Sequence, residues 1–187
     1  QYISLYPELT VEEMLRKAAG EDFNTQSYRS EIVNPLELEK IFDRRAEELS
    51  GGEIQKVAIA LCLSKKAQLY LLDEPSAFLD VDERLNVAKI IRKRVEDAGA
   101  TAIVVEHDVS VQDFIADKLM HFSGKPGKHG YASKPLSLRD GMNSFLKEIG
   151  VTFRRDPSTG RPRVNKENSK MDRYQKEIGE YYYIPVG

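Results

Sequence analysis

The chain has 187 residues, of which 41% are hydrophobic, so it can bury one substantial core and a smaller appendage. Its net charge of −2 excludes a globally basic nucleic-acid-binding protein. The single cysteine, Cys62, excludes a disulfide framework and favours a reducing compartment. No apolar run approaches the ~20 residues needed to span a bilayer, and no signal peptide is visible.

The first 49 residues predict helices. Thr10 and Glu13 form a capping box, which predicts a helix that begins at Thr10. Pro35 interrupts this region, and the next helix is expected from Leu36 to about Ala46.

The string Ser50-Gly51-Gly52-Glu53 predicts the start of an amphipathic helix. Ser50 and Glu53 are spaced as a capping box. Gly51 and Gly52 lack a Cβ and let a phosphate approach the backbone closely. The unpaired N–H groups and the positive end of the helix dipole favour an anion there. Taken alone, the string is also typical of an ordinary capped helix after a turn.

A short apolar run, Leu69 to Leu72, predicts a strand that is buried on both faces of a parallel sheet. Asp73 then lies at the end of the strand, where its carboxylate can hold Mg²⁺. Glu74 is placed to orient or deprotonate an attacking water. The alternative is a strand that ends in a polar turn, because Pro75 prevents its continuation.

A second buried strand is expected at Thr101–Val105, after a helix at about Val81 to Ala98. A helix between two strands implies that the strands are parallel, so their polar ends meet at one edge. His107 follows the second strand, where it can hydrogen-bond a γ-phosphate and sense its presence. His121 and His129 have no such setting and are interpreted as capping or surface residues.

The last third predicts smaller elements and a mildly basic end. Residues 151–187 hold eight Lys/Arg against five Asp/Glu, a surplus of +3, which leaves −5 for the remainder. Such an end suits contact with RNA phosphate or an acidic surface, and a solvated tail is the alternative. The expected elements are a helix at about Val109 to Asp117, strands near Leu119 to Phe122 and about Tyr131, a helix from Leu138 to about Ile149, an extended or irregular segment at Arg154 to Lys166, and an edge strand at Glu180 to Pro185.

In this order and spacing the motifs resemble those of the ATP-binding cassette (ABC) ATPases. The resemblance implies an α/β fold of the P-loop NTPase class, with a mostly parallel sheet flanked by helices, a helical subdomain and a C-terminal extension. It also implies the divisions 1–49, 50–122 and 123–187. The matching segments are Leu49 to Glu53 (signature motif), Leu71 to Glu74 (Walker B strand), Ser76 to Asp80 (D-loop), His107 (switch histidine) and Gln1 (Q-loop glutamine).

By this resemblance, Glu74 and His107 are catalytic, and Asp73 and Gln1 hold Mg²⁺. ATP would be bound mostly in trans, by the signature of one cassette closing over the Walker A loop of another. The residues expected to bind it are Ser50, Gly51, Gly52, Glu53 and Asp80.

A Walker A motif is missing from the chain. The nearest string, Gly124 to Lys128, has the wrong spacing and no following hydroxyl. The chain also starts at Gln1, without a methionine, where a Walker A half would just have ended. We therefore expect a fragment of a longer protein, which by itself binds ATP poorly and hardly hydrolyses it.

Five segments are similar to one family in particular, the soluble twin-cassette ribosome-recycling ATPase (ribonuclease L inhibitor) of archaea and eukaryotes. This resemblance implies the second cassette of a protein that splits ribosomes into subunits after termination or rescue. The segments are Asp73 to Asp80, Val104 to Asp108, Gly141 to Leu146, Val151 to Pro157 and Arg161 to Lys166.

The resemblance also implies partners and a location. The partners are the first cassette of the same polypeptide, the small ribosomal subunit with its RNA, and a termination or rescue release factor. The protein would be cytoplasmic, without a membrane contact, and its 4Fe-4S clusters would lie only in an N-terminal region outside this sequence. A hinge segment would contact partners through Arg154, Arg155, Arg161 and Arg163.

Two other functions remain open at this point. The chain could be the ATPase subunit of a membrane ABC transporter, although the basic C-terminal segment is not typical of transporter cassettes. It could also be a non-catalytic interaction module, although Asp73, Glu74 and His107 argue against that for the intact protein.

Overall fold

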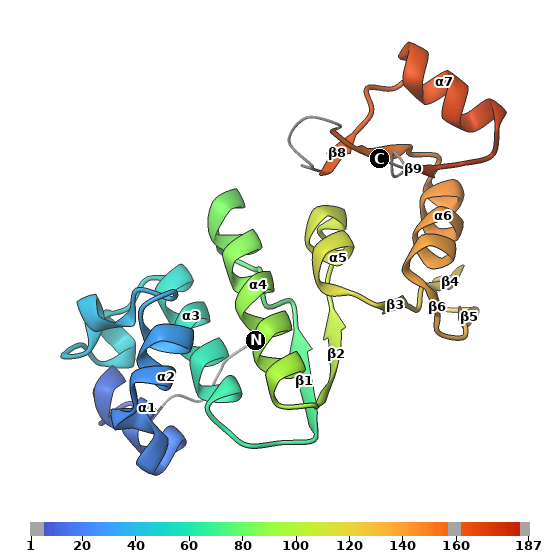
Figure 1. Ribbon diagram of the computed structural model, residues 1–187. Coiled ribbons are helices and arrows are strands. Elements are labelled where there is room, and N and C mark those ends of the chain that lie inside the picture. The colour runs from blue at the N-terminus through green and yellow to red at the C-terminus, as the bar shows by residue number, and fades with distance from the viewer. Residues whose placement is uncertain (1–5, 157–161, 184–187) are drawn as a thin grey trace. The chain divides into compact units, whose positions relative to one another are not determined.

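The computed structural model describes residues 6–156 and 162–183, and the chain divides into two units, residues 1–115 and 116–187. Each unit has its own sheets and helices, coloured from blue to red along the chain in Figure 1. Among the described residues, no helix is both long and apolar enough to cross a membrane.

Unit 1 begins with short helical segments packed around one apolar core. The predicted capping box is present, because the Thr10 side chain accepts from Glu13 N–H while the Glu13 carboxylate accepts from Thr10 N–H. The segments are helix α1 (Val11–Ala19), the 3-10 helix η1 (Gly20–Asn24), helix α2 (Gln26–Tyr28), the π-helix η2 (Arg29–Val33), and the 3-10 helices η3 (Leu38–Ile41) and η4 (Ala46–Glu48).

The α-helix expected at Leu36–Ala46 is wrong. Glu37 has a left-handed backbone (φ 56°), so only the short 3-10 helix η3 follows it. The carbonyls of Phe42 and Arg44 accept bonds from the first N–H groups of α1 and are therefore not available to a continuing helix. Long-range backbone bonds override the local pattern here.

The rest of unit 1 is a helix–strand–helix–strand–helix run. Its elements are α3 (Gly51–Leu63), β1 (Leu69–Asp73), α4 (Val81–Asp97), β2 (Thr101–Val105) and α5 (Val109–Ile115). As predicted, β1 and β2 are parallel, with Asp73 opposite Val105 in the register. The carboxyl ends of both strands therefore lie at one edge.

The two strands are buried on one face only, which differs from the prediction. Tyr70 and Leu72 are 3% and 7% exposed, because that face packs into the core with α3 and α4. On the other face, Leu71 is 68% and Ile103 is 56% exposed. A run of apolar residues does not reveal how many faces of a strand are covered.

Unit 2 starts with short strands and one long helix. β3 (Lys118–Leu119) pairs antiparallel with β6 (Leu136–Ser137), and β4 (Phe122–Lys125) pairs antiparallel with β5 (His129–Ala132). The strand expected at Leu119–Phe122 is thus divided between β3 and β4. Helix α6 (Leu138–Ile149) has the predicted bounds, with Ser137 as its N-cap and Gly150 after its end.

The end of unit 2 is more ordered than the sequence predicts. β7 (Phe153–Arg155) lies between β8 (Pro162–Val164) and β9 (Tyr182–Tyr183) in one sheet, and helix α7 (Lys170–Glu177) was not expected. Phe153 and Tyr182 stack with ring centroids 5.7 Å apart and are both buried. The expected strand at Glu180–Pro185 is confirmed only at β9, since residues 184–187 lie outside the described part.

Candidate nucleotide site

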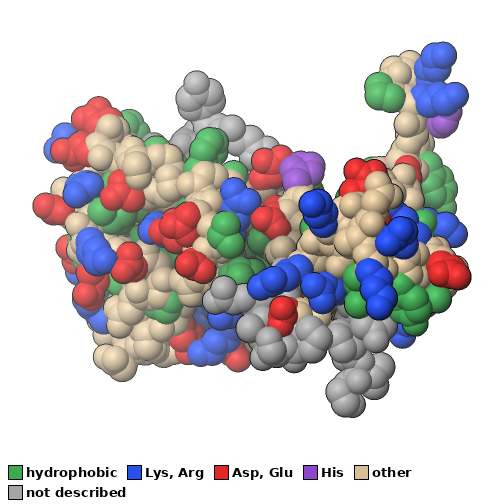
Figure 2. Space-filling view, turned by 90° about the horizontal axis from the view of Figure 1, so that it is seen from above, with side chains coloured by type: hydrophobic (Ala, Val, Ile, Leu, Met, Phe, Trp, Pro, Cys, Tyr) green, Lys and Arg blue, Asp and Glu red, His purple; other side chains and the backbone are tan. Residues whose placement is uncertain are grey.

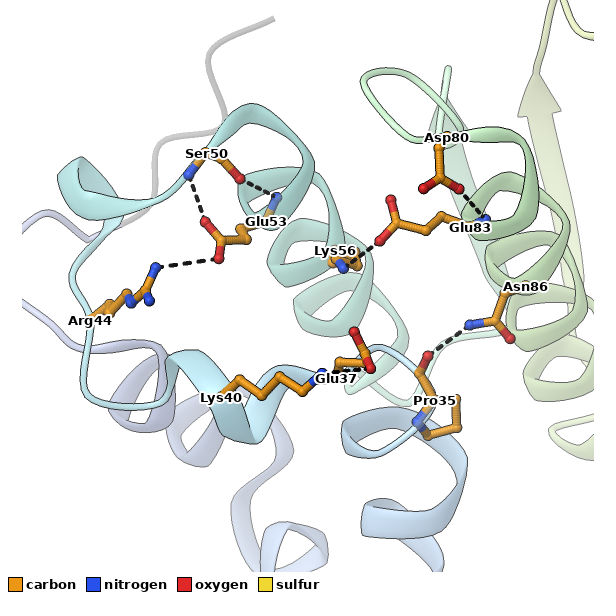
Figure 3. Close-up of polar contacts among 10 residues, drawn as sticks. All are labelled: Pro35, Glu37, Lys40, Arg44, Ser50, Glu53, Lys56, Asp80, Glu83 and Asn86. Carbon is orange, nitrogen blue, oxygen red and sulfur yellow. Dashed lines mark hydrogen bonds and ion pairs between the residues drawn. The ribbon is translucent and has the colours of Figure 1, made fainter.

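The signature helix α3 begins at the predicted cap (Figure 3). Ser50 Oγ accepts from Glu53 N–H at 3.3 Å, and Glu53 Oε2 accepts from Ser50 N–H at 2.8 Å. Arg44 Nη1 lies 3.4 Å from Glu53 Oε1. The bond from Ser50 N–H lowers the pKa of the Glu53 carboxyl, so the capping box contains a carboxylate. Glu53 is thereby engaged within its own helix start.

Gly51 and Gly52 lie directly against the D-loop. A Cβ added at Gly51 would be 3.6 Å from the Phe78 ring, an ordinary contact. A Cβ added at Gly52 would be 3.2 Å from the Phe78 carbonyl oxygen, which is tighter than most such contacts. The Phe78 side chain itself is 79% exposed. The lack of side chains at these two positions therefore lets the D-loop pack closely against the start of α3.

Glu74 follows β1 in an uncommon backbone conformation. Its φ is 46°, in the left-handed region that non-glycine residues rarely adopt. Its N–H donates to the Val105 carbonyl at 2.9 Å, and its own carbonyl accepts from Gln55 Nε2 at 3.1 Å. Gln55 Nε2 also contacts the Pro75 carbonyl. Contacts from β2 and α3 therefore hold the turn that aims this carboxylate.

The two residues predicted to be catalytic are in contact. His107 Nε2 lies 3.0 Å from Glu74 Oε1, although the two residues are 33 positions apart in the chain. Their side chains are 77% and 50% exposed, so water and a ligand can reach both. They line an open cavity of about 300 Å³, together with Ser76, Ala77, Arg84, Glu106 and Asp108.

The loop after β2 is fixed by a set of charged and amide groups. Glu106 Oε1 accepts from the N–H groups of His107 and Asp108, at 2.9 and 3.0 Å. Asp108 Oδ2 pairs with Arg84 Nη1 at 3.0 Å, and Asp108 Oδ1 accepts from Ser110 N–H at 2.8 Å. This network positions His107 at the edge of the cavity.

Polar contacts join the signature helix to α4, which follows the D-loop (Figure 3). Asp80 caps α4 by accepting from Glu83 N–H at 2.9 Å. Glu83 Oε1 in turn lies 2.7 Å from Lys56 Nζ of α3, and that lysine side chain is only 14% exposed. Asn86 Nδ2 donates to the Pro35 carbonyl at 2.7 Å. Helical subdomain, signature helix and D-loop are therefore linked within unit 1.

Asp73 ends β1 at the same edge as Glu74 and His107. Carboxylate oxygens such as those of Asp73 are ligands that Mg²⁺ prefers. In proteins Mg²⁺ is usually held by one or two carboxylates, water and substrate phosphates. Within residues 6–156 and 162–183, no group of three or more His, Cys, Asp or Glu side chains is placed to hold a metal. Asp73 supplies one carboxylate at this edge of the sheet. Gln1 lies outside the described residues.

The predicted hinge arginines lie on the β7–β8 pair, apart from Arg161, which is outside the described residues. Arg154 is directly opposite Arg163 in the register. Arg163 Nε lies 3.7 Å from Asp156 Oδ2, and Arg154 Nε is buried without a hydrogen-bond partner. Arg155 completes β7. Like charges directly opposite each other are unfavourable, and Asp156 supplies Arg163 with one anionic contact.

The structure adds site residues that the sequence does not reveal. Gln55 reaches the turn at Glu74, Arg84 pairs with Asp108, and Lys56 pairs with Glu83. These contacts join residues 19 to 27 positions apart, on different elements. The local sequence pattern does not predict these contacts. The only local signal is the position of Arg84, one helical turn after Asp80.

Comparison with known proteins gives three kinds of match. The ABC transporter family model matches residues 1–77. An uncharacterized ABC transporter ATP-binding protein of Methanocaldococcus jannaschii is 56% identical over 98% of this chain and 30% of its own length. The translation initiation factor RLI1 of Saccharomyces cerevisiae is 42% identical over 96% of this chain and 29% of its own length. The chain thus spans about a third of these relatives.

Solved structures agree with these sequence matches. A complex of the archaeal ribosomal stalk protein aP1 with the archaeal ribosome recycling factor aABCE1 matches with a TM-score of 0.92 and 54% identity, over 98% of this chain and 36% of the other. A model of ribosome-bound archaeal Pelota and ABCE1 matches with a TM-score of 0.90 and 52% identity, over 97% and 31% of the two chains.

Proposed function

We propose that this chain is part of an ATPase that splits ribosomes into subunits, namely the part that carries the catalytic carboxylate and the signature motif. The chain is an ABC-type ATPase domain with strong homology to the ribonuclease L inhibitor proteins. The observation that carries the proposal is the contact of Glu74 with His107 at the shared carboxyl edge of β1 and β2. That edge lies beside the D-loop, which packs on the signature glycines.

The ribosomal part of the proposal is supported by what the similar proteins are. One is described as an archaeal ribosome recycling factor in complex with a stalk protein, and another as bound to the ribosome with Pelota. For the intact protein we propose as partners the small ribosomal subunit and its RNA, a termination or rescue release factor, and the first cassette of the same polypeptide. We also propose that the intact protein holds 4Fe-4S clusters in an N-terminal region outside this sequence.

In the proposed reaction, Glu74 orients the attacking water and accepts its proton. The contact between His107 Nε2 and Glu74 Oε1 holds the carboxylate in place. The histidine is also exposed enough to contact an incoming γ-phosphate. Hydrolysis removes that phosphate, and the contact that favoured the closed form of the two cassettes is lost with it.

ABC ATPases bind nucleotide, typically with Mg²⁺, and we propose specific residues for both here. Ser50, Gly51 and Gly52 present the helix start to the phosphates of an ATP held by the opposing cassette. Glu53 and Asp80 are proposed to bind the same ATP, and both residues cap helices, Glu53 at α3 and Asp80 at α4. Asp73 and Gln1 are proposed to hold Mg²⁺, which supplies charge neutralisation at the phosphates when bound.

The arginines of the C-terminal segment have a different proposed role. Arg154, Arg155, Arg161 and Arg163 are proposed to contact partner carboxylates, backbone carbonyls or ribosomal RNA rather than the nucleotide. The positions of Arg154 and Arg163 support this: they are directly opposite each other in the register, and a partner anion there would add to the one carboxylate, Asp156, that Arg163 contacts.

The proposal is tested with Glu74→Gln in the intact protein. The amide keeps the size of the side chain but cannot accept the proton, so we expect ATP binding to remain and turnover to fall about 100-fold or more. The closed state then accumulates. After incubation with ribosomes and ATP, sedimentation through a sucrose gradient should place the variant with the small subunit and show loss of intact ribosomes.

A matched control is Glu21→Gln, an exposed glutamate on η1 with the same chemical change. It should behave as the wild type in both measurements. An unchanged ATPase rate in Glu74→Gln would remove this residue from catalysis. Recovery of the protein with membranes instead of ribosomal subunits would replace the ribosomal proposal with the transporter alternative.

A further inference from the structure

A basic stretch in unit 2 is not among the residues named above for the nucleotide site. Residues 118–139 contain five cationic residues and no Asp or Glu, in a chain whose net charge is −2. Half of this stretch forms the β4–β5 hairpin, whose tip is the Gly124–Lys128 string that fails as a Walker A motif. The five residues are Lys118, Lys125, Lys128, Lys134 and Arg139.

The hairpin exposes aromatic and cationic side chains together. Directly paired residues share a face, so the pairs Ser123–Tyr131 and Lys125–His129 place Tyr131, His129 and Lys125 on one face. Tyr131 is 64% exposed, and Lys125 and His129 are exposed as well. Figure 2 shows a narrow projection whose outer end carries Lys or Arg and His side chains.

The other face of the hairpin has little side-chain bulk. It carries the glycine pair Gly124–Gly130 and, beside it, Phe122, which is 80% exposed. Gly124 has a φ of 143°, and a Cβ there would come within 2.3 Å of the His129 carbonyl oxygen. The close pairing of the two strands therefore requires glycine at position 124. The side chains at the tip of the hairpin do not pack into a core.

The net charge of unit 2, which contains the hairpin, is also positive. Unit 2 holds 14 Lys/Arg against 8 Asp/Glu, a net charge of +6, whereas unit 1 holds 14 against 22, a net charge of −8. An exposed aromatic ring beside lysines is the arrangement by which proteins stack a base and neutralise the adjacent phosphates. An acidic protein surface would satisfy the lysines but would leave the exposed rings without a matching partner.

We propose that the β4–β5 hairpin binds single-stranded RNA, with a base stacked on Tyr131 and phosphates bound by Lys125 and Lys128. The inference rests on the proposed function for its biological setting, in which the RNA is an unpaired loop of ribosomal RNA. The chemistry of the hairpin itself does not depend on ATP hydrolysis. RNA binding and ribosome binding are therefore measured separately.

The first test removes the charges in Lys125→Gln/Lys128→Gln. Binding of the intact protein to a fluorescein-labelled oligouridylate is followed by anisotropy at several salt concentrations. Loss of two phosphate contacts should weaken binding and reduce the slope of log K against log salt by about 1.4. The matched control, Lys93→Gln/Lys147→Gln, removes two exposed lysines elsewhere and should leave the slope unchanged.

The second test addresses the ring. Tyr131→Ala should weaken oligouridylate binding about tenfold, whereas Tyr131→Phe, which keeps the stacking face, should bind as the wild type. Unchanged ATPase activity in all variants shows that they fold. Equal oligouridylate binding by the wild type, the lysine variant and Tyr131→Ala would overturn the proposal and make the hairpin a solvated turn.

Pelleting with purified small ribosomal subunits separates this proposal from the proposed function. If the hairpin variants lose oligouridylate binding while even the wild type fails to bind subunits, the RNA proposal stands and the ribosomal one falls. If the variants lose subunit binding but bind oligouridylate normally, the partner is an acidic protein and the RNA proposal falls.

Discussion

At the scale of single residues, the site depends on backbone conformations that are costly in isolation. Glu74 and Phe78 both have a left-handed backbone, with φ of 46° and 63°. Each such non-glycine residue costs about 1–2 kcal/mol. For Glu74 the bonds to Val105 and Gln55 offset this cost. The result is a carboxylate aimed at His107 rather than along the strand direction.

The substitution Gly51→Ala in the signature motif should change the stability and the ATPase rate of the protein in opposite directions. In the middle of a helix alanine is about 0.5–1 kcal/mol more favourable than glycine, and part of this gain applies to Gly51 at the first position of α3. The added methyl meets only an ordinary contact with Phe78. We expect the melting temperature of the intact protein to rise slightly and its ATPase rate to fall, because the methyl adds bulk between the D-loop and the helix start that we propose to meet the phosphates.

Gly52→Ala is the matched comparison. Its methyl would come within 3.2 Å of the Phe78 carbonyl oxygen, so the D-loop must shift and the gain in stability should be absent. Thermal melting and ATPase assays on both variants check this. Equal melting temperatures for the two would contradict the close packing of the D-loop on Gly52.

At the scale of elements, α7 is attached to its sheet by a buried polar network rather than by apolar residues. Asp172 is 2% exposed and accepts from Thr152 Oγ1 at 2.6 Å, while Lys176 Nζ lies 3.0 Å from its other oxygen. Gln175 is fully buried and donates to the carbonyls of Phe153 and Glu180. This network joins α7 to β7 and to the segment before β9.

The network makes the stability of unit 2 sensitive to acid. The hydrogen bond from Thr152 lowers the pKa of Asp172 in the folded state. The ionised form is therefore favoured by folding, and its contribution is present above the ordinary aspartate pKa of about 3.9 and lost as the pH falls through the lower folded value. Denaturant unfolding of the intact protein between neutral pH and about pH 3, followed by hydrogen exchange of α7 amides, measures this loss.

Asp172→Asn should destabilise α7 by about 1–3 kcal/mol at neutral pH, because a bond to a charged acceptor is lost. The variant should also lose less stability on acidification than the wild type. A parallel pH dependence in the two proteins would show that other carboxylates dominate. Asp140→Asn, at the first turn of α6, is the control for removing an exposed carboxylate.

Helices α6 and α7 show how much of the secondary structure the local sequence pattern predicts. The caps at Thr10, Ser50 and Ser137 are set within four residues, and the bounds of α6 follow directly from the sequence. Helix α7 has Ser169 as an equally regular cap, but its polar composition conceals it because its buried groups are Asp172 and Gln175. A pattern based on apolar residues does not detect a helix that docks through hydrogen bonds.

At the scale of the whole molecule, two surface features dominate. The two units carry opposite net charges, −8 and +6. Unit 1 also exposes one face of the β1–β2 pair, where large apolar side chains lie side by side. A contiguous exposed apolar face of this kind favours association. The residues are Leu69, Leu71, Ile103 and Val105, each between 48% and 68% exposed.

The 187-residue chain by itself should therefore bind the dye ANS and associate in solution. Leu71→Gln/Ile103→Gln should reduce both the dye fluorescence and the sedimentation coefficient, because it makes the centre of this face polar. The control, Ile149→Gln/Ile178→Gln, changes two apolar residues that are exposed elsewhere and should leave both unchanged. The same dye fluorescence in both double variants would contradict the assignment of the dye to the sheet face.

The sequence by itself determined the helix caps, the parallel order of β1 and β2, and the chemical nature of the site. These depend on residues that are near each other in the chain, or on the rule that a helix joins parallel strands. Only the tertiary structure decided that His107 meets Glu74, that Phe78 covers Gly52, and that a single face of the strand pair is covered. It also replaced the helix expected after Pro35, because the carbonyls of Phe42 and Arg44 bond to α1. In each case the deciding interaction joins groups far apart in the chain, and local propensity carries no information about it.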